Sequence, residues 1–266
     1  MPYSVRALAL ASGSSGNSIY LESRNTSILI DAGHNCKFLE NNMKTQGIDP
    51  LGLSAILLTH EHSDHMSAVS VLARKYGLAV YGTKLTLEAA RKRMTSTEKI
   101  IFREILPYES FVIGDLYCRA VRVSHDSVDA VAYKVDAGKA IVSVVTDTGL
   151  WSDEMSKELI GSDLIFLEAN YDEEMLWTGP YPWPLKRRVA SEYGHLSNLA
   201  SAEAAYKLLT TGTSRIVLIH LSKVNNTPEL AYEYISHYLA ERGLQSGLDY
   251  SMSVANRYEP SLWQIL

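Results

Sequence analysis

Residues 60 to 65 carry five side chains that can bind a metal ion or transfer a proton. They belong to the segment Thr59-His60-Glu61-His62-Ser63-Asp64-His65, which follows an apolar run and precedes a helical pattern. Side chains two positions apart on an extended strand share a face, so His60 and His62 can bind one ion. Asp64 and His65 fall at the turn into the helix and can bind a neighbouring ion. Imidazole and carboxylate are ligands of zinc, manganese and iron, so the segment predicts a metal site.

The plainer interpretation of this segment is a surface histidine cluster or a helix cap. Three histidines and two acids within six residues, at the end of a buried strand, argue strongly against it. The HExxH helix of a zinc protease is excluded, because here an acid lies between histidines that are two positions apart.

Three more candidate ligands stand at the ends of other predicted strands. His125 follows the strand Tyr117–Ser124, Asp147 ends the strand Ala140–Asp147, and His220 ends the strand Arg215–His220. Loops gather at strand ends and form binding sites there. Each residue alone also fits a satisfied buried histidine or an aspartate that starts a turn. Their recurrence at strand ends favours the interpretation as ligands.

Short apolar runs rich in β-branched residues alternate with helical patterns along the chain. The remaining predicted strands are Ser4–Leu10, Ser18–Glu22, Ser27–Asp31, Ala55–Thr59, Ala79–Tyr81, Leu164–Ala169 and Ser251–Asn256. Helices are predicted from about Met66 to Gly77 and over Lys84–Met94, Asp153–Ile160, Asn198–Leu209 and residues 227–243. Early hairpin-like strands followed by strand–helix alternation favour an α/β sandwich with mixed β-sheets.

Composition limits the class of protein. The chain has 266 residues, 46% of them hydrophobic, and a formal net charge of −5. This excludes a disordered acidic tail and a globally basic nucleic-acid coat, so any contact with nucleic acid must be local. Cys36 and Cys118 form no CxxC pattern and fit a reducing cytosol. Because no membrane-spanning run or convincing signal peptide is present, we expect a cytoplasmic protein with a single domain over residues 1–266.

The candidate ligands resemble, as a set, those of the metallo-β-lactamase superfamily over essentially the whole chain. The segment Leu29–Gly33 also resembles the superfamily's first motif, in which Asp31 would have a structural role. The resemblance implies an αββα four-layer sandwich with two divalent metal ions, Zn²⁺ or Mn²⁺, in a cleft along one edge. It assigns the ligands as follows: His60, His62 and His125 to one ion, Asp64, His65 and His220 to the other, and Asp147 to both as a bridge.

Two such ions activate water and stabilise charge on the reacting oxygens, a chemistry that serves phosphodiesters, thioesters and lactams alike. True lactamases of this superfamily generally lack a bridging carboxylate such as that of Asp147. The diiron redox branch has a glutamate where this chain has His62, so we expect no redox chemistry. The segments around Glu168 and His195 resemble motifs of the superfamily's nucleases and tRNA 3′-processing enzymes. In those enzymes a Glu–His pair helps to protonate the leaving oxygen.

The residues themselves support this assignment. The leaving alkoxide of a phosphodiester needs a proton, which a histidine oriented by a carboxylate could supply. Ser197 and Asn198, near a predicted helix start, could donate hydrogen bonds to a phosphate. The alternative is a salt-bridged Glu168 at a strand end and an unrelated loop histidine. We expect Asp64, Glu168 and His195 to act in catalysis.

Two further segments are expected to contact substrate. Residues 171–189 combine tryptophans with the basic triplet Lys186-Arg187-Arg188, which suits single-stranded nucleic acid. The alternative is a loop that packs its tryptophans and leaves its cations solvated. In the glycine-rich segment Ser12–Asn17, Ser14 and Asn17 could contact a phosphate, although a plain hairpin turn explains the segment equally well.

The motifs together most resemble the YycJ/WalJ group of bacterial exonucleases. They run from Ala11 to His220 and read ASGSSGN, DAG, THEHSDH, SHD, TDTG, EANYD, YPW and GHLSN. The resemblance implies a DNA exonuclease with a link to mismatch repair. The alternatives are a small-molecule hydrolase acting on a thioester or cyclic nucleotide, and a non-catalytic nucleic-acid-binding module. The native metal, the choice between DNA and RNA, and the oligomeric state stay open.

Overall fold

The computed structural model describes residues 5–266, which group into two compact units. Unit 1 contains the described part of Met1–Arg122 together with Ser127–Ala140 and Asn256–Leu266, and unit 2 contains Val123–Asp126 and Ile141–Ala255. The predicted strand Ser4–Leu10 begins at Ser4, which lies outside the described residues. That residues 1–266 form a single domain stays a prediction.

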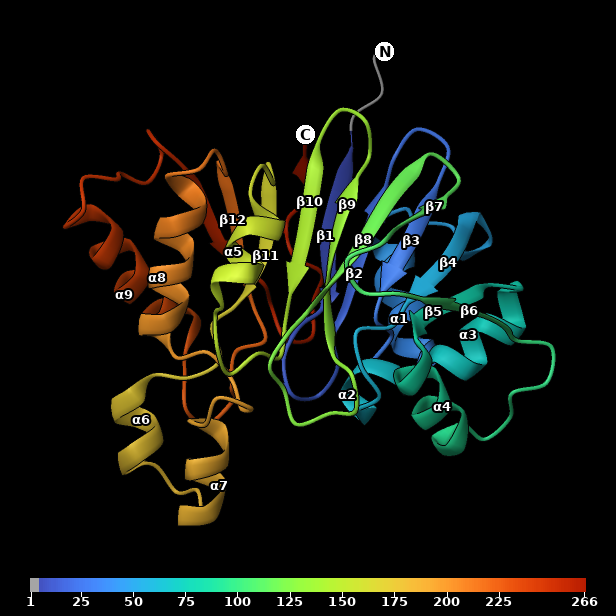
Figure 1. Ribbon diagram of the computed structural model, residues 1–266, viewed down its shortest axis with the longest axis horizontal. Coiled ribbons are helices and arrows are strands. Elements are labelled where there is room, and N and C mark those ends of the chain that lie inside the picture. The colour runs from blue at the N-terminus through green and yellow to red at the C-terminus, as the bar shows by residue number, and fades with distance from the viewer. Residues whose placement is uncertain (1–4) are drawn as a thin grey trace. The chain divides into compact units, whose positions relative to one another are not determined.

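A mixed seven-stranded sheet runs through unit 1 in the order β14-β1-β2-β3-β4-β5-β6 (Figure 1). Its strands are β1 (Arg6–Ala11), β2 (Ser18–Glu22), β3 (Ser27–Ile30), β4 (Leu53–Leu57), β5 (Ala79–Thr83), β6 (Ile101–Ile105) and β14 (Gln264–Ile265). The first four in this order pair antiparallel, and β3 to β6 pair parallel. The parallel half therefore places the carboxyl ends of β3 and β4 at one edge of the sheet, where Asp31 and the histidine segment follow.

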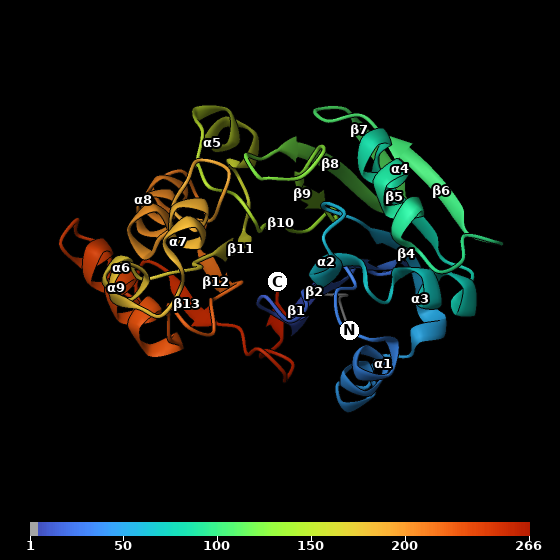
Figure 2. The same ribbon diagram turned by 90° about the horizontal axis from the view of Figure 1, so that it is seen from below.

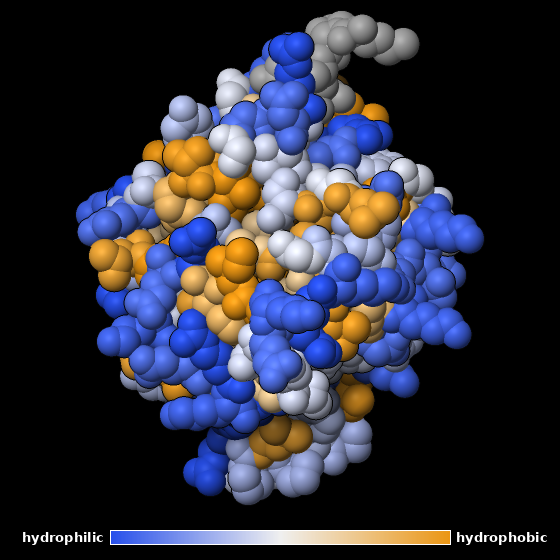
Figure 3. All heavy atoms as spheres, turned by 90° about the vertical axis from the view of Figure 1, so that its right-hand side faces the viewer, coloured by the Kyte–Doolittle hydropathy of each residue, from blue (hydrophilic) through white to orange (hydrophobic). Residues whose placement is uncertain are grey.

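Helices connect the parallel strands of unit 1. They are α1 (Cys36–Thr45), the 3₁₀ turn η1 (Pro50–Gly52), α2 (Ser63–Met66), α3 (Val69–Tyr76) and α4 (Lys84–Arg93). Leu39, Ile56 and Leu72 belong to the apolar core that joins helices and sheet, and its burial is the main driving force for folding. Figure 3 shows the right-hand side of Figure 1, where hydrophilic residues are mixed with hydrophobic ones.

Three antiparallel strands complete unit 1. They are β7 (Ser110–Ile113), β8 (Leu116–Arg122) and β9 (Val131–Asp136). The β9 strand contacts the chain directly after β4, because Tyr133 donates from Oη to the carbonyl of Leu58 at 2.9 Å and Val131 donates from N to the carbonyl of Thr59 at 3.1 Å. These bonds fix the backbone just before the histidine segment.

Unit 2 contains four parallel strands in the order β13-β12-β11-β10. They are β10 (Ile141–Val145), β11 (Leu164–Glu168), β12 (Arg215–Ile219) and β13 (Ser251–Val254), with helices α5 (Asp153–Leu159), α6 (Glu173–Thr178), α7 (Trp183–Val189), α8 (Asn198–Leu209) and α9 (Pro228–Ala240) between them. Figure 2 shows α5, α8 and α9 on the same side of these strands. Because the strands are parallel, the carboxyl ends of β10, β11 and β12 meet at one edge.

Most of the predicted elements are confirmed. The predicted helix from Met66 to Gly77 corresponds to α3, which the short helix α2 precedes, and the helix over 227–243 is α9, with Thr227 as its N-cap. Residues 171–189, for which the sequence predicts no helix, contain α6 and α7. The sequence also misses α1, β6, β7, β9 and β14; β6 exposes most of its residues and so lacks an apolar pattern. No helix in residues 5–266 is long and apolar enough to cross a membrane.

Candidate metal and catalytic site

The histidine segment of unit 1 brings three imidazoles together at the carboxyl end of β4. His60 and His65 are buried, and His62 is partly exposed as the N-cap of α2. The ring centroid of His60 lies 4.7 Å from that of His62 and 4.1 Å from that of His65. Asp64, in the first turn of α2, places Oδ2 3.5 Å from Nε2 of His65. The strand end and the short helix thus gather all four predicted ligands of this segment.

Asp31 orients His65 within this group. The buried carboxylate accepts from Nδ1 of His65 at 2.7 Å, from Oγ1 of Thr59 at 2.7 Å and from the Thr59 backbone N–H at 2.8 Å. Burial raises the pKa of Asp31 above its usual value, although the charge of His65 and these hydrogen bonds act against the increase. Because Nδ1 is bonded to Asp31, His65 can ligate a metal through Nε2. The ligand pattern of the sequence does not indicate this role of Thr59, although Thr59 directly precedes His60.

Gly33, which follows β3, and the glycine-rich segment Ser12–Asn17 both lie close to the backbone of Asp64 in α2. A Cβ on Gly33 would lie 1.6 Å from the carbonyl oxygen of Asp64, so only glycine fits at this approach. Asn17 donates from its backbone N–H to the same carbonyl at 2.8 Å, and its Nδ2 lies 3.1 Å from Nε2 of His65. Ser14 is exposed. The segment therefore supports the ligand loop, and contact of Ser14 and Asn17 with substrate stays a prediction.

Four side chains of unit 2 meet where β10, β11 and β12 end. Asp147, Glu168, His195 and His220 each offer one ligand atom, and these atoms all lie within 4.8 Å of one another. The φ angle is positive at Asp147 (49°) and at His220 (56°). It is also positive at Asp31 of unit 1 (62°). Such left-handed conformations are uncommon outside glycine. They turn the chain sharply at the strand end.

Glu168 connects two histidines through one oxygen. Its Oε1 accepts from Nδ1 of His195 at 2.8 Å and from Nδ1 of His220 at 2.9 Å, while Oε2 accepts from the backbone N–H of Thr148 at 2.9 Å. Burial raises the pKa of Glu168, but the charge of His195 and the bonds from both histidines outweigh it, so the pKa lies below its ordinary value. Glu168 is therefore an ionised carboxylate at neutral pH, and each histidine presents its Nε2 away from it.

His125 lies beside this cluster in unit 2. Its Nδ1 donates to the carbonyl of Gly194 at 3.1 Å, and its Nε2 lies 3.6 Å from Oδ1 of Asp147. Burial lowers the pKa of His125, which favours the neutral imidazole that metals bind. The centroid of its ring lies 5.3 Å from that of His195. Three predicted ligands and both members of the Glu–His pair thus lie together in unit 2.

The predicted phosphate contacts lie close to this cluster but have local partners. Ser197 is the N-cap of α8 and accepts from the backbone N–H of Ala200 at 3.2 Å. Asn198 exchanges amide hydrogen bonds with Asn226, at 2.8 and 3.3 Å. Both residues are buried and stabilise the loop that carries His195. Their contact with substrate stays a prediction.

The basic triplet on α7 is only partly exposed. Lys186 is buried and donates from Nζ to the carbonyl of Trp177 at 2.7 Å. Arg187 is exposed, and Arg188 forms an ion pair with Asp126. Lys186 therefore joins α7 to α6 in this structure. Arg187 and Arg188 are the members of the triplet whose guanidinium groups face solvent at least in part.

Comparison with known proteins gives matches over most of the chain. The model of the β-lactamase superfamily domain matches residues 26–221. Exodeoxyribonuclease WalJ of Streptococcus pneumoniae is 41% identical over 248 residues, which cover 91% of each chain, and exodeoxyribonuclease YycJ of Bacillus anthracis is 38% identical over 90% of each chain.

Solved structures show the same fold at low sequence identity. The metallo-β-lactamase fold protein YhfI of Bacillus subtilis has a TM-score of 0.75 at 17% identity and covers 99% of this chain and 100% of its own. The short form of human tRNase Z has a TM-score of 0.68 at 16% identity, with 97% and 98% covered. The fold class expected from the sequence, the mixed-sheet sandwich of this superfamily, is confirmed.

Proposed function

The chain belongs to the β-lactamase superfamily, and from that premise we propose that it is a metal-dependent DNA exonuclease. The observation that carries the proposal is the identity of 38–41% to exodeoxyribonucleases over nine-tenths of both chains. The class of metal-dependent hydrolase follows from the family. The choice of DNA, a role in mismatch repair and a cytoplasmic location are our proposals.

We propose that seven side chains bind two divalent metal ions, Zn²⁺ or Mn²⁺. They are His60, His62 and His125 for one ion, Asp64, His65 and His220 for the other, and Asp147 as a bridge. The donor set fits such ions, because it combines imidazole nitrogens with carboxylates and because Asp31 and Glu168 bond to Nδ1 of two of the histidines. When bound, the ions supply an activated water and stabilise charge on the phosphate oxygens.

In this proposal His195 donates the proton that the leaving oxygen of the phosphodiester needs. Its Nδ1–H donates to Glu168, so the transferred proton is carried on Nε2. The ring is partly exposed, with 14% of its side-chain surface accessible, so substrate can reach it. Glu168 is ionised and stabilises the protonated imidazole before transfer. Asp64, the third predicted catalytic residue, would act beside His65.

A nuclease assay tests the function directly. Protein treated with a chelator and then supplied with Mn²⁺ or Zn²⁺ is incubated with end-labelled single- and double-stranded DNA and RNA. We expect stepwise shortening of DNA only after metal is restored, and no shortening by the variant His60→Ala. An exposed histidine, changed in His237→Ala, is the matched control, since 78% of its side-chain surface is accessible. If no nucleic acid is cut with either metal, the proposal is wrong and a small-molecule substrate becomes the better candidate.

A further inference from the structure

Helices α6 and α7 form a hairpin that is attached directly to the segment carrying His195. Figure 1 shows the two helices next to each other in unit 2. The backbone N–H of His195 donates to the carbonyl of Val189, the last residue of α7, at 3.0 Å. At the other end of the hairpin, Tyr171 pairs with Ser197 in an isolated β-bridge. The two chain ends of the hairpin are therefore joined to the segment that carries the proposed proton donor.

The hairpin has its own small apolar core. Tyr171, Leu176 and Val189 are buried in it, and Leu185 packs against them. Lys186 adds a hydrogen bond from α7 to the last turn of α6. These contacts define the relative position of the two short helices without using the large side chains on their outer surface.

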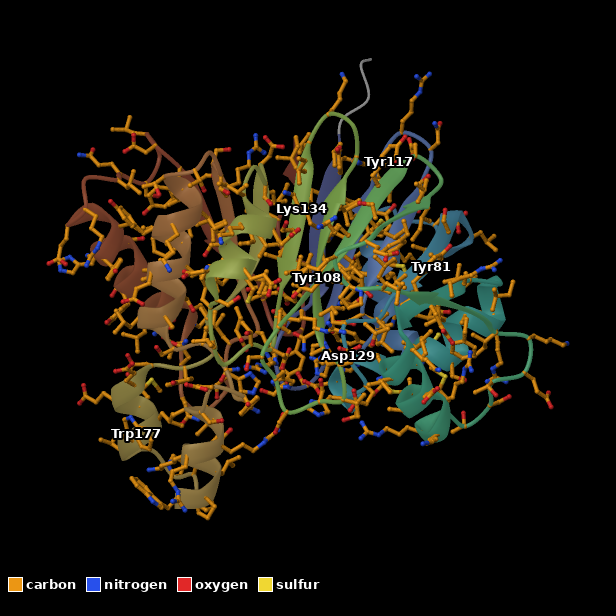
Figure 4. All side chains as sticks on the ribbon, viewed as in Figure 1. Tyr81, Tyr108, Tyr117, Asp129, Lys134 and Trp177 are labelled. Carbon is orange, nitrogen blue, oxygen red and sulfur yellow. The ribbon has the colours of Figure 1, made fainter. Side chains whose placement is uncertain are left out.

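Trp177 of α6 and Trp183 of α7 lie outside this core. They are 41% and 58% exposed, and their ring centroids are 5.4 Å apart with an interplanar angle of 47°. Figure 4 labels Trp177 on α6. Tryptophan is highly buried on average, so two adjacent exposed indoles on different helices need an explanation. Their apolar faces offer area for a planar ligand.

We propose that Trp177 and Trp183 form a base-stacking surface for a single strand of the nucleic-acid substrate. The inference rests on the proposed function and adds a subsite to it. Aromatic rings that stack bases and cations that meet phosphates are the usual means of binding a single strand without sequence preference. Arg187 lies four residues after Trp183, one turn along the same face of α7, and supplies that charge, whereas Arg188 is paired with Asp126. The acids Glu173 and Glu174 lie in the first turn of α6, so the phosphates are expected to run along α7.

Equilibrium binding tests the stacking surface separately from cleavage. The probe is a fluorescein-labelled oligothymidylate with phosphorothioate linkages, which slow its hydrolysis, and it is titrated with metal-loaded full-length protein. We expect Trp177→Leu and Trp183→Leu each to weaken binding about tenfold, since one stacked base has an effect of this order. Trp→Phe changes at the same positions keep a ring and should restore most of the affinity.

An abasic strand of equal length and the variant Trp151→Phe are the controls. Trp151 lies outside α6 and α7 and donates to Ser156 of α5, so its change should leave the affinity for oligothymidylate unaltered. The abasic strand keeps the phosphates, so the leucine variants should bind it about as well as the unchanged protein does. Equal affinity of the wild type and both leucine variants for oligothymidylate would overturn the inference. A leucine variant that changes the oligomeric state but not DNA binding would also overturn it, because the two tryptophans would then form a contact between copies of the chain. Absence of cleavage by the wild type in the nuclease assay would overturn the proposed function instead, and the binding data would still decide the stacking surface.

Discussion

The change Glu168→Gln isolates the role of the central carboxylate in unit 2. Both oxygens of Glu168 accept hydrogen bonds: Oε1 from His195 and His220, and Oε2 from the backbone N–H groups of Thr148 and Leu196, the last at 3.3 Å. Glutamine has the same shape but replaces one acceptor with an NH₂ group. Whichever way the amide turns, two donors lose their acceptor.

The two orientations of the glutamine have different consequences. If NH₂ faces the backbone, two hydrogen bonds to a charged group are lost, which costs about 3–6 kcal/mol in the free energy of unfolding. If it faces the histidines, both rings must accept through Nδ1, and the proton on Nε2 then prevents His220 from ligating a metal. We therefore expect a melting temperature lower by at least roughly 6 °C, or loss of bound metal, and DNA cleavage slower by about 100-fold or more.

Three measurements on the same preparation separate these outcomes: thermal unfolding, metal content and the rate of DNA cleavage. The matched control is Glu233→Gln, an exposed glutamate on α9 that should leave all three unchanged. A Glu168→Gln protein with wild-type melting temperature, metal content and rate would refute the argument that Glu168 orients the two histidines.

Two substitutions near the histidine segment and one labelling experiment on the cysteines give further tests. Gly33→Ala places a Cβ 1.6 Å from the backbone oxygen of Asp64 and should lower the free energy of unfolding by about 1–3 kcal/mol, measured by thermal or urea unfolding. The control Gly52→Ala, whose Cβ would meet no atom within 4 Å, should leave it unchanged. Asp31→Asn removes the carboxylate that orients His65. This change should weaken zinc binding about 10- to 100-fold in a competition titration with a chromophoric chelator. Burial raises the pKa of Cys118 to about 12 and that of Cys36 to about 11. Both thiols should therefore resist iodoacetamide at neutral pH, as measured by mass spectrometry, and Cys36 should react first as the pH rises. Fast labelling of the native protein at neutral pH would contradict this.

Much of the site could be predicted because ligand types and strand ends are local properties of the sequence. The cluster from His60 to His65 follows an apolar strand, and Asp147 and His220 follow two others, so parallel pairing alone places them at sheet edges. The Glu168–His195 contact confirms a proximity that the motifs suggested. That these residues bind metal and transfer protons stays a prediction.

What the sequence could not predict depends on tertiary contacts. The α6–α7 hairpin consists of helices too short to show a clear period, and contacts around Leu176 and Val189 stabilise it. Lys186 reads as a surface cation in the basic triplet, but its stem is buried and its ammonium group bonds to a carbonyl. The second partner of Glu168, His220, lies 52 positions away, and only the adjacent pairing of β11 and β12 brings it near.

Asp31, Asp147 and His220 have left-handed backbone conformations, which lower the stability of the folded chain at positions proposed to serve the metal site. Conformations of this kind cost about 1–3 kcal/mol each in residues other than glycine. Glycine at position 147 would relax that turn and yet delete a proposed ligand. A thermostable variant that carries glycine at position 147 should therefore be assayed for DNA cleavage as well as for its melting temperature.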